Sequence, residues 1–155
     1  MATITKEIKE LSKITSEEWK EWTMTVWNIA NISDSVHPAV FPVEIPYRLL
    51  RMFSFWGETI LDPFSGTGTT GEAALSNGRK YVGFETNSTY YERSTQRLLE
   101  VIQNKNIENA NEAFVIHNHS CLDMASIPDN SIGAVITSPP YWNKAWRVHW
   151  KYWWI

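Results

Sequence analysis

The chain has 155 residues, of which 43% are hydrophobic, enough for one packed globular domain and too many for a disordered chain. Its formal net charge of −3 argues against a domain that grips nucleic-acid phosphates over a wide surface. A single cysteine excludes an internal disulfide framework, and neither Cys121 nor the four histidines show metal-ligand spacing, so no metal site is predicted.

The sequence contains no apolar run as long as a membrane span. Charged residues occupy the N-terminal stretch MATITKEIKELSK, where a signal peptide needs an apolar segment. These two features predict a cytoplasmic protein that does not bind membranes.

Three helices are predicted before the first strand. The stretches TKEIKELSKI (5–14) and TSEEWKEW (15–22) have helical spacing, and the second begins with a capping residue and acids in its first turn. Prolines at 38, 42 and 46 then enforce a turn-rich path, after which helical spacing returns in VEIPYRLLRMFS (43–54).

The remaining chain alternates between strand and helix patterns. The predicted strands are TILDPF (59–64), KYVGFE (80–85), AFVIHN (113–118) and IGAVITS (132–138). Helices are predicted after the glycine loop that begins at Ser65 and in NSTYYERSTQRLLEVIQNK (87–105). Such alternation indicates an α/β fold with a parallel sheet.

The glycine loop lies between a strand and a helix start. Gly66 and Gly68 would let a ligand approach the backbone, and the helix N-terminus favours a carboxylate or phosphate. Gly66, Gly68 and Gly71 also match the GxGxxG pattern of dinucleotide-binding folds, a weak signal by itself, whereas a Walker A loop is excluded because no Lys-Ser or Lys-Thr pair follows.

Two acids end the first two strands. Glu85 is placed to accept both hydroxyls of a ribose, although a helix cap is an equally weighted interpretation. Asp62 precedes Pro63-Phe64, a rigid turn that would aim its carboxylate into the crevice at the carboxyl ends of the strands, although a turn-forming acid is the simpler interpretation.

The stretch TSPPYW follows the last strand. Two adjacent prolines cannot continue a sheet ladder, because neither has an N–H to donate. The strand must therefore end in a stiff turn that presents the Ser138 hydroxyl, backbone carbonyls and the Tyr141 ring.

DPFSGTGTT and TSPPYW resemble the cofactor-binding and catalytic motifs of the amino-methylating (N4-cytosine and N6-adenine) DNA methyltransferases of restriction-modification systems. The flanking stretches HPAVFPVEIPYRLLRMFS and GRKYVGFETNSTYYERSTQRL are also similar to this family. The resemblance implies a Rossmann-like methyltransferase fold in a bacterial, archaeal or phage protein, with about four strands in the order 3-2-1-4 and helices on both faces.

The resemblance also implies the functional residues. S-adenosyl-L-methionine would be bound by His37, Pro38, Asp62, Phe64, Ser65, Gly66, Thr67, Gly68 and Glu85, with Phe41 less surely. The catalytic residues would be Ser138, Pro139, Pro140 and Tyr141. Relatives often carry Gly-Asp-Ser where this chain has Asn118-His119-Ser120, so the acid expected near the adenine is missing.

Ser138 points to the exocyclic N4 of cytosine as methyl acceptor, because an Asp or Asn before Pro-Pro-Tyr usually accompanies adenine in this family. Hydrogen bonds from the amino group to the Ser138 hydroxyl and the Pro139 carbonyl would localise the nitrogen lone pair. A paired base cannot reach such a pocket, so it would be flipped out and stacked on Tyr141.

The chain departs from the family in two respects. The cofactor motif precedes the catalytic motif, which is a permuted order relative to the group it resembles, and no target-recognition region is evident. We expect one domain with a helical lead-in (1–36), a cofactor-binding half (37–105), a catalytic-motif segment (110–142) and a Trp-rich tail (143–155).

Four strands in this order would leave the last strand as an open apolar edge. We expect the tail, a second copy or a complementing polypeptide to cover it, unless the chain is a fragment. The alternatives to an N4-cytosine DNA methyltransferase with a DNA-recognising partner are a cofactor-binding remnant or regulatory subunit without catalysis, and an N6-adenine DNA or an RNA or protein amino-group methyltransferase. A GxGxxG dehydrogenase comes last, because it leaves TSPPYW unexplained.

Overall fold

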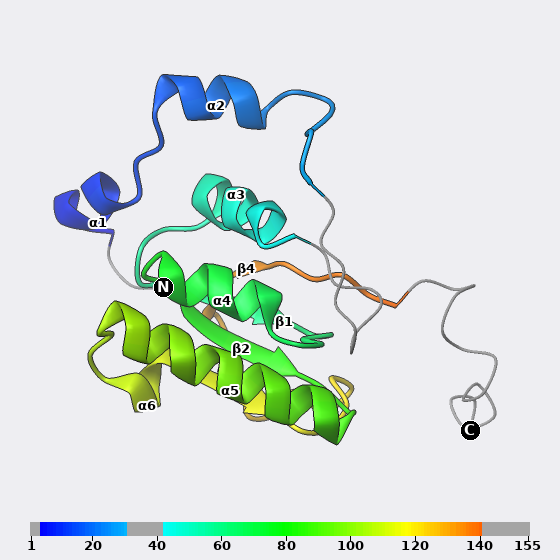
Figure 1. Ribbon diagram of the computed structural model, residues 1–155. Helices are drawn as coiled ribbons and strands as arrows, with labels where there is room; N and C mark the ends of the chain where they lie inside the picture. The colour runs from blue at the N-terminus through cyan, green and yellow to red at the C-terminus, as the bar shows by residue number, and fades with distance from the viewer. Residues whose placement is uncertain (1–3, 31–41, 141–155) are drawn as a thin grey trace.

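The computed structural model describes residues 4–30 and 42–140 (Figure 1). The helices are α1 (Lys6–Leu11), α2 (Ser16–Trp22), α3 (Glu44–Phe53), α4 (Thr69–Ser76), α5 (Ser88–Lys105) and the four-residue α6 (Ala110–Ala113). The strands are β1 (Thr59–Asp62), β2 (Lys80–Phe84), β3 (Phe114–His117) and β4 (Ile132–Val135). Each predicted helix and strand within the described ranges is confirmed, and α6 is an additional short turn.

Side-chain caps explain where three of the helices begin, α1 with Thr5 among them. Thr15 and Glu18 form a reciprocal capping box at the start of α2, and the Asn87 side chain accepts a hydrogen bond from the Tyr90 N–H at the start of α5. By contrast, α4 begins directly after Gly68 and has no side-chain cap. The first turn of α4 therefore leaves backbone donors available toward the loop that precedes it.

All three strand pairings are parallel, and the sheet order is β3-β2-β1-β4. Leu61 of β1 pairs with both Val82 of β2 and Val135 of β4. The predicted α/β fold, its parallel sheet and its strand order are confirmed. Because the strands are parallel, their carboxyl ends lie along one edge of the sheet.

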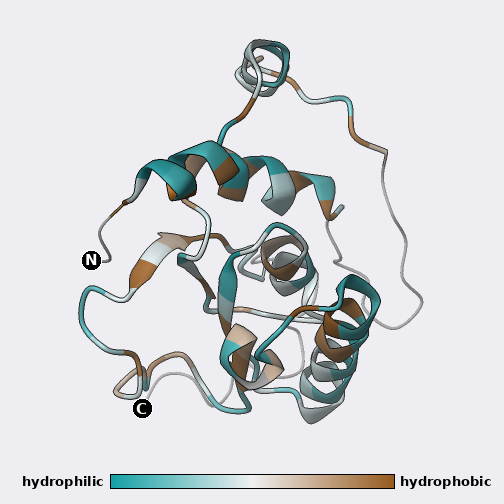
Figure 2. Cartoon of the chain, turned by 90° about the vertical axis from the view of Figure 1, so that its left-hand side faces the viewer, coloured by the Kyte–Doolittle hydropathy of each residue, from teal (hydrophilic) through white to brown (hydrophobic). Residues whose placement is uncertain are grey.

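The hydrophobic core lies between one face of the sheet and the helices α3, α4 and α5 (Figures 1 and 2). Ile60 and Tyr81 of the sheet pack with Ala74 of α4 and Leu98 of α5, and these side chains are almost completely buried. Leu50 adds α3 to the same cluster. Burial of this shared face fixes the helices relative to the strands.

The opposite face of the sheet is covered differently in the described residues. The connection between β3 and β4 consists of turns instead of a crossover helix, and its residues 126–128 line a pocket on this face with Val82 and Val115. Val115 is 46% exposed and Val135 of the edge strand β4 is 57% exposed. The described helices α3, α4 and α5 pack on the other face, where the hydrophobic core lies.

The N-terminal helices are attached to α3 by polar and aromatic contacts. Arg48 of α3 forms ion pairs with Glu21 (2.8 Å) and Glu44 (2.7 Å), and its guanidinium lies 5.3 Å from the centre of the Trp27 ring. Arg51 donates a hydrogen bond to the Lys13 carbonyl. None of the described helices is long and apolar enough to cross a membrane.

The core account predicts opposite results for two adjacent leucines of α5. Leu98 is completely buried and Leu99 is 52% exposed. Leu98→Ala should lower the free energy of unfolding by about 2–5 kcal/mol, because it removes a buried side chain and leaves a cavity. Leu99→Ala should change it by less than about 0.5 kcal/mol. Urea unfolding of the two variants measures the difference, and equal losses would contradict this description of the core.

Candidate functional site

The carboxyl ends of the four parallel strands bring the predicted motifs to one edge of the sheet (Figure 1). β1 ends at Asp62, and the segment that runs from this residue to the start of α4, residues 62–68, is called the glycine loop here. Glu85 directly follows β2, and Ser138 follows β4. In the register of β1 with β4, Leu61 pairs with Val135, so Phe64 and Ser138 each lie three residues beyond a paired position.

Backbone hydrogen bonds hold the glycine loop against the sheet. The Ser65 N–H donates to the Phe84 carbonyl (2.9 Å), and the Gly68 N–H donates to the Ser65 carbonyl (2.9 Å). The Asp62 carboxylate accepts from the Phe64 N–H (3.1 Å) and so shapes the turn at Pro63. The loop therefore has a defined path into the first turn of α4.

Gly68 is required by both conformation and space. Its φ of 82° lies in the left-handed region, where side chains are disfavoured. A Cβ built at Gly68 would lie 3.0 Å from the Cβ of Ser94, a buried residue of α5. The close packing of the loop on α5 thus depends on the absence of a side chain at Gly68.

Glu85 joins the end of β2 to the glycine loop. Its carboxylate accepts from the Gly66 N–H (2.9 Å) and from the Asn87 N–H (2.8 Å). Burial raises the pKa of Glu85, and the three backbone N–H donors around it oppose that rise. Glu85 therefore ties the glycine loop to the residue that caps α5, and each carboxylate oxygen retains capacity for a further donor.

Asp62 is 1% exposed and carries the deepest carboxyl of the site. Burial raises its pKa, while the side chains of Thr137 and Thr70 and the Phe64 N–H lower it to a smaller extent. Its charge also raises the pKa of Glu85. A negative charge on Asp62 therefore disfavours the ionised form of Glu85.

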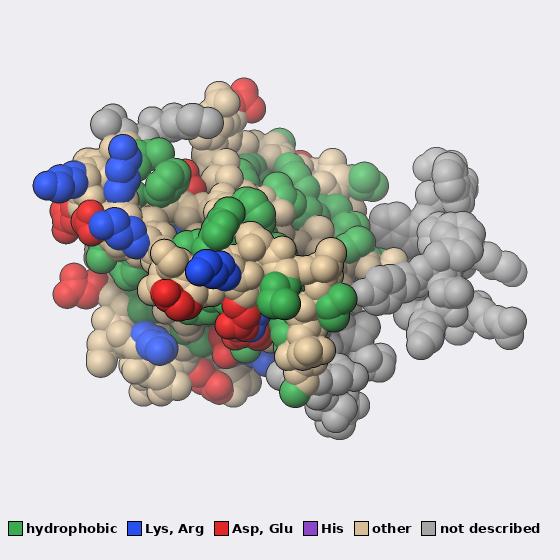
Figure 3. Space-filling view, turned by 90° about the horizontal axis from the view of Figure 1, so that it is seen from above, with side chains coloured by type: hydrophobic (Ala, Val, Ile, Leu, Met, Phe, Trp, Pro, Cys, Tyr) green, Lys and Arg blue, Asp and Glu red, His purple; other side chains and the backbone are tan. Residues whose placement is uncertain are grey.

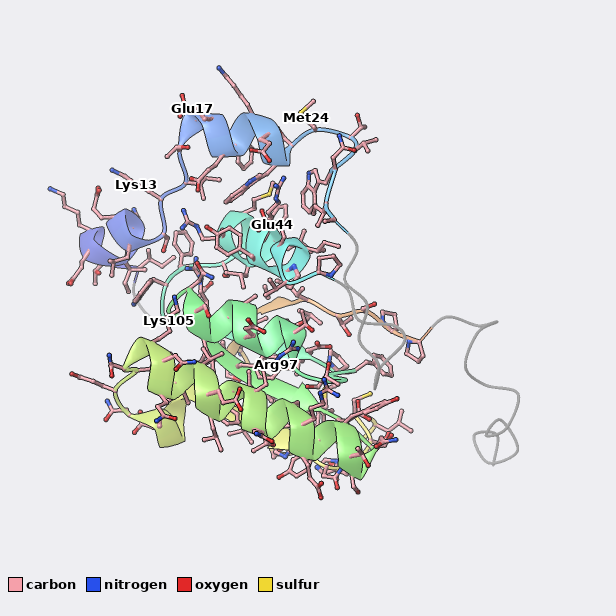
Figure 4. All side chains as sticks on the ribbon, in the orientation of Figure 1. Lys13, Glu17, Met24, Glu44, Arg97 and Lys105 are labelled. Atoms are coloured by element: carbon pink, nitrogen blue, oxygen red, sulfur yellow. The ribbon has the colours of Figure 1, made fainter. Side chains whose placement is uncertain are left out.

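Two supporting residues were missed by the sequence interpretation. Arg97 of α5 donates to the Thr67 carbonyl (3.1 Å) and to the Thr69 hydroxyl (3.0 Å), and it lies on the side of α5 that faces α4 (Figure 4). The buried Tyr81 hydroxyl donates to the Ser65 hydroxyl (2.8 Å). Neither has a motif-like signal, because each contacts the loop from another element far away in sequence.

The Ser138 turn begins where the sheet ladder ends. The Ile136 N–H donates to the Leu61 carbonyl (3.0 Å), which is the last β1–β4 bond before the prolines. Ser138 is half-buried, whereas Pro139 and Pro140 are exposed. The turn therefore presents its prolines at the surface beside the glycine loop.

The predicted site residues fall into two groups. The structure brings Asp62, Phe64, Ser65, Gly66, Thr67, Gly68, Glu85, Ser138, Pro139 and Pro140 to one edge of the sheet. His37, Pro38, Phe41 and Tyr141 lie outside the described residues, as does the Trp-rich tail. The Asn118 side chain donates to the Glu85 carbonyl (2.8 Å), so it supports the end of β2.

A family model described as DNA methylase (N6_N4_Mtase) matches residues 2–96, more than half of the chain. The chain belongs to this family. The match includes the glycine loop and Glu85, and it confirms the resemblance to the amino-methylating DNA methyltransferases.

Named relatives agree with this assignment. The type II methyltransferase M.MjaI of Methanocaldococcus jannaschii is 43% identical over 84 residues, which are 50% of this chain and 27% of that protein. The type II methyltransferase M.BglI of Bacillus subtilis is 34% identical over 116 residues, which are 72% of this chain and 32% of that protein. The chain thus spans about a third or less of these relatives.

A solved structure has the same arrangement. TTHA0409 of Thermus thermophilus, described as a putative DNA modification methylase in complex with S-adenosyl-L-methionine, superposes with a TM-score of 0.56 and 31% identity. The superposition covers 75% of this chain and 42% of TTHA0409. The methyltransferase fold is thereby confirmed for the matched part.

The burial of Asp62 predicts how stability depends on pH. The pKa of Asp62 is higher in the folded chain than in the unfolded chain, so at pH values between these two pKa values the folded chain binds more protons. The contribution of Asp62 to the free energy of unfolding therefore falls as pH rises through this range. Asp62→Asn removes this penalty. The stability difference, variant minus wild type, should therefore increase as pH rises above about 4, the ordinary pKa of an aspartate.

Urea unfolding at several pH values measures that difference. Leu99→Ala, at an exposed position, should give a pH-independent difference. A variant that loses stability relative to the wild type as pH rises would show that the Asp62 carboxylate is stabilised, not penalised, by its surroundings.

Proposed function

We propose that this chain is the cofactor-binding and catalytic part of an S-adenosyl-L-methionine-dependent DNA methyltransferase that modifies the N4 amino group of a flipped cytosine. The observation that carries the proposal is the position of the glycine loop and the Ser138 turn after two adjacent parallel strands, β1 and β4. A cofactor held by the glycine loop would lie beside a base held by the Ser138 turn.

The glycine loop fits S-adenosyl-L-methionine. The loop passes close to α5 at Gly68, where a side chain would collide, and it leads into a helix without a side-chain cap. Glu85 supplies an acceptor-only carboxylate at the end of β2 for the ribose hydroxyls. When bound, the cofactor supplies an electrophilic methyl group on its sulfonium.

In this proposal the acceptor half consists of Ser138 and the Pro139 carbonyl. The amino group of a flipped cytosine donates to both, and these bonds strengthen as positive charge grows on the nitrogen during transfer. This mechanism needs no covalent cysteine. Ser138 has the half-buried position that such a contact requires.

The assignment to cytosine rests on Ser138, in the position that carries Asp or Asn in adenine-modifying members. The matching family includes both N6 and N4 methylases, so N6-adenine is the second candidate. Both reactions would use the same two halves of the site. The modified nucleoside itself distinguishes them.

We also propose that a DNA-recognising partner completes the protein. The face in Figure 3 has cationic and anionic side chains close together, without a wide basic field for phosphates among the described residues. The exposed β4 edge offers unpaired strand backbone and the 57% exposed Val135 for a second copy or complementing polypeptide. A cofactor-binding regulatory subunit without catalysis is the alternative.

The test is methyl transfer to unmethylated DNA of mixed sequence, followed by mass spectrometry of its nucleosides. Wild-type chain with S-adenosyl-L-methionine should produce N4-methylcytosine. Ser138→Ala should lower that product by about 100-fold or more while retaining cofactor affinity, because it removes one preorganised acceptor of the reacting amino group.

Gly66→Val provides the matched control, because it should abolish cofactor binding by filling the backbone approach. Detection of N6-methyladenine as the product would contradict the assignment to cytosine and support the second candidate, N6-adenine methylation. If Ser138→Ala transferred methyl groups as fast as the wild type, the assigned acceptor site would be refuted. If the wild-type chain bound the cofactor but transferred no methyl group, the alternative of a regulatory subunit without catalysis would be favoured.

A further inference from the structure

The Asp62 carboxyl is approached by two threonine hydroxyls from separate parts of the fold. Thr70 lies in the first turn of α4, and Thr137 follows β4. Asp62 and Thr70 are each 1% exposed, and the Thr137 hydroxyl oxygen is buried. Both hydroxyls interact with the carboxyl and lower its pKa.

Neither hydroxyl has a hydrogen-bond partner of ordinary geometry among the described residues. They are therefore near the carboxyl without being aligned with it. A buried hydroxyl left in this state costs free energy, so the cluster gains if a small movement completes the bonds. Active-site hydrogen bonds are often long in the free protein and tighten when ligands bind.

Thr137 is the point at which the two halves of the site meet. Asp62 opens the glycine loop, and Thr137 directly precedes Ser138. The bond from the Ile136 N–H to the Leu61 carbonyl joins the residues that immediately precede Thr137 and Asp62, at the ends of adjacent strands. A bond between their side chains would therefore fix the distance between the loop and the Ser138 turn.

We propose that Thr137 is a positioning residue that joins the glycine loop to the Ser138 turn through Asp62. This inference rests on the proposed function, because it assigns a cofactor to the loop and a base to the turn. Cofactor binding then aligns the Thr137 hydroxyl with Asp62, and the aligned Thr137 holds Ser138 at the correct depth. By reciprocity, fixing either side improves binding at the other.

The other polar groups near Asp62 are engaged with other partners, so they do not take the place of the Thr137 hydroxyl. The Tyr81 hydroxyl donates to Ser65, and Glu85 accepts bonds from Gly66 and Asn87. Among the described residues, the Phe64 N–H donates to Asp62, and the two threonine hydroxyls are the other donor groups that lower its pKa. Thr137 is the donor that comes from the catalytic-motif segment.

The test is a double-mutant cycle with Thr137→Val and Asp62→Asn, read as affinity for S-adenosyl-L-methionine by calorimetry. Thr137→Val keeps the shape and removes the hydroxyl, so it should weaken binding by about 10-fold, the size expected for one hydrogen bond to a charged group. In the Asp62→Asn background, the same change should weaken binding by less than about twofold. Thr137→Ser should restore most of the affinity.

Thr95→Val is the matched control, because the Thr95 hydroxyl is also buried without a described partner but lies in α5. Its affinity should stay within about twofold of the wild type. An equal effect of Thr137→Val in both backgrounds, or no effect in either, would overturn the proposal.

A wild-type chain that binds no cofactor would contradict the proposed function. The role of Thr137 would then be tested by the urea unfolding midpoints of the wild type, the two single variants and the double variant. In the cofactor-free chain, Thr137→Val should leave the midpoint unchanged or raise it, because it removes a buried hydroxyl that has no aligned partner. An equal decrease in both backgrounds would show that Thr137 acts by packing alone and not through Asp62.

Discussion

The parallel pairing of β1 with both of its neighbours is the constraint on which the site depends. It places the ends of β2, β1 and β4 side by side, so that Glu85, the glycine loop and the Ser138 turn follow three adjacent strands. Two backbone bonds extend this arrangement past the strands, from Ser65 to Phe84 and from Ile136 to Leu61. The proximity of the two motifs is therefore a property of the backbone.

The candidate site contains groups that reduce the stability of the folded chain. Asp62 and Glu85 both have raised pKa values because burial disfavours their ionised forms, and buried hydroxyls beside Asp62 lack well-aligned partners. Such unfavourable groups persist because the surrounding core is well packed. Their position in the cofactor half agrees with the role that we propose for the loop, since perturbed acids cluster at functional sites.

The features that could be predicted from the sequence are those that depend on residues close together in the chain. The capping box at Thr15, the glycine loop and the apolar strand patterns predicted the elements and their α/β arrangement, because each depends on residues close in sequence. Arg97 and Tyr81 could not be found in this way, since their roles follow from the packing of α5 and β2 on the loop.

The central claim is that residues 42–140 hold a working cofactor half. Calorimetric titration of the purified chain with S-adenosyl-L-methionine, with light scattering of the same sample, tests it most directly. The account predicts saturable binding at one site per chain in an assembly of defined mass, because the glycine loop and Glu85 are positioned by contacts within these residues. No saturable binding by a folded chain would contradict it.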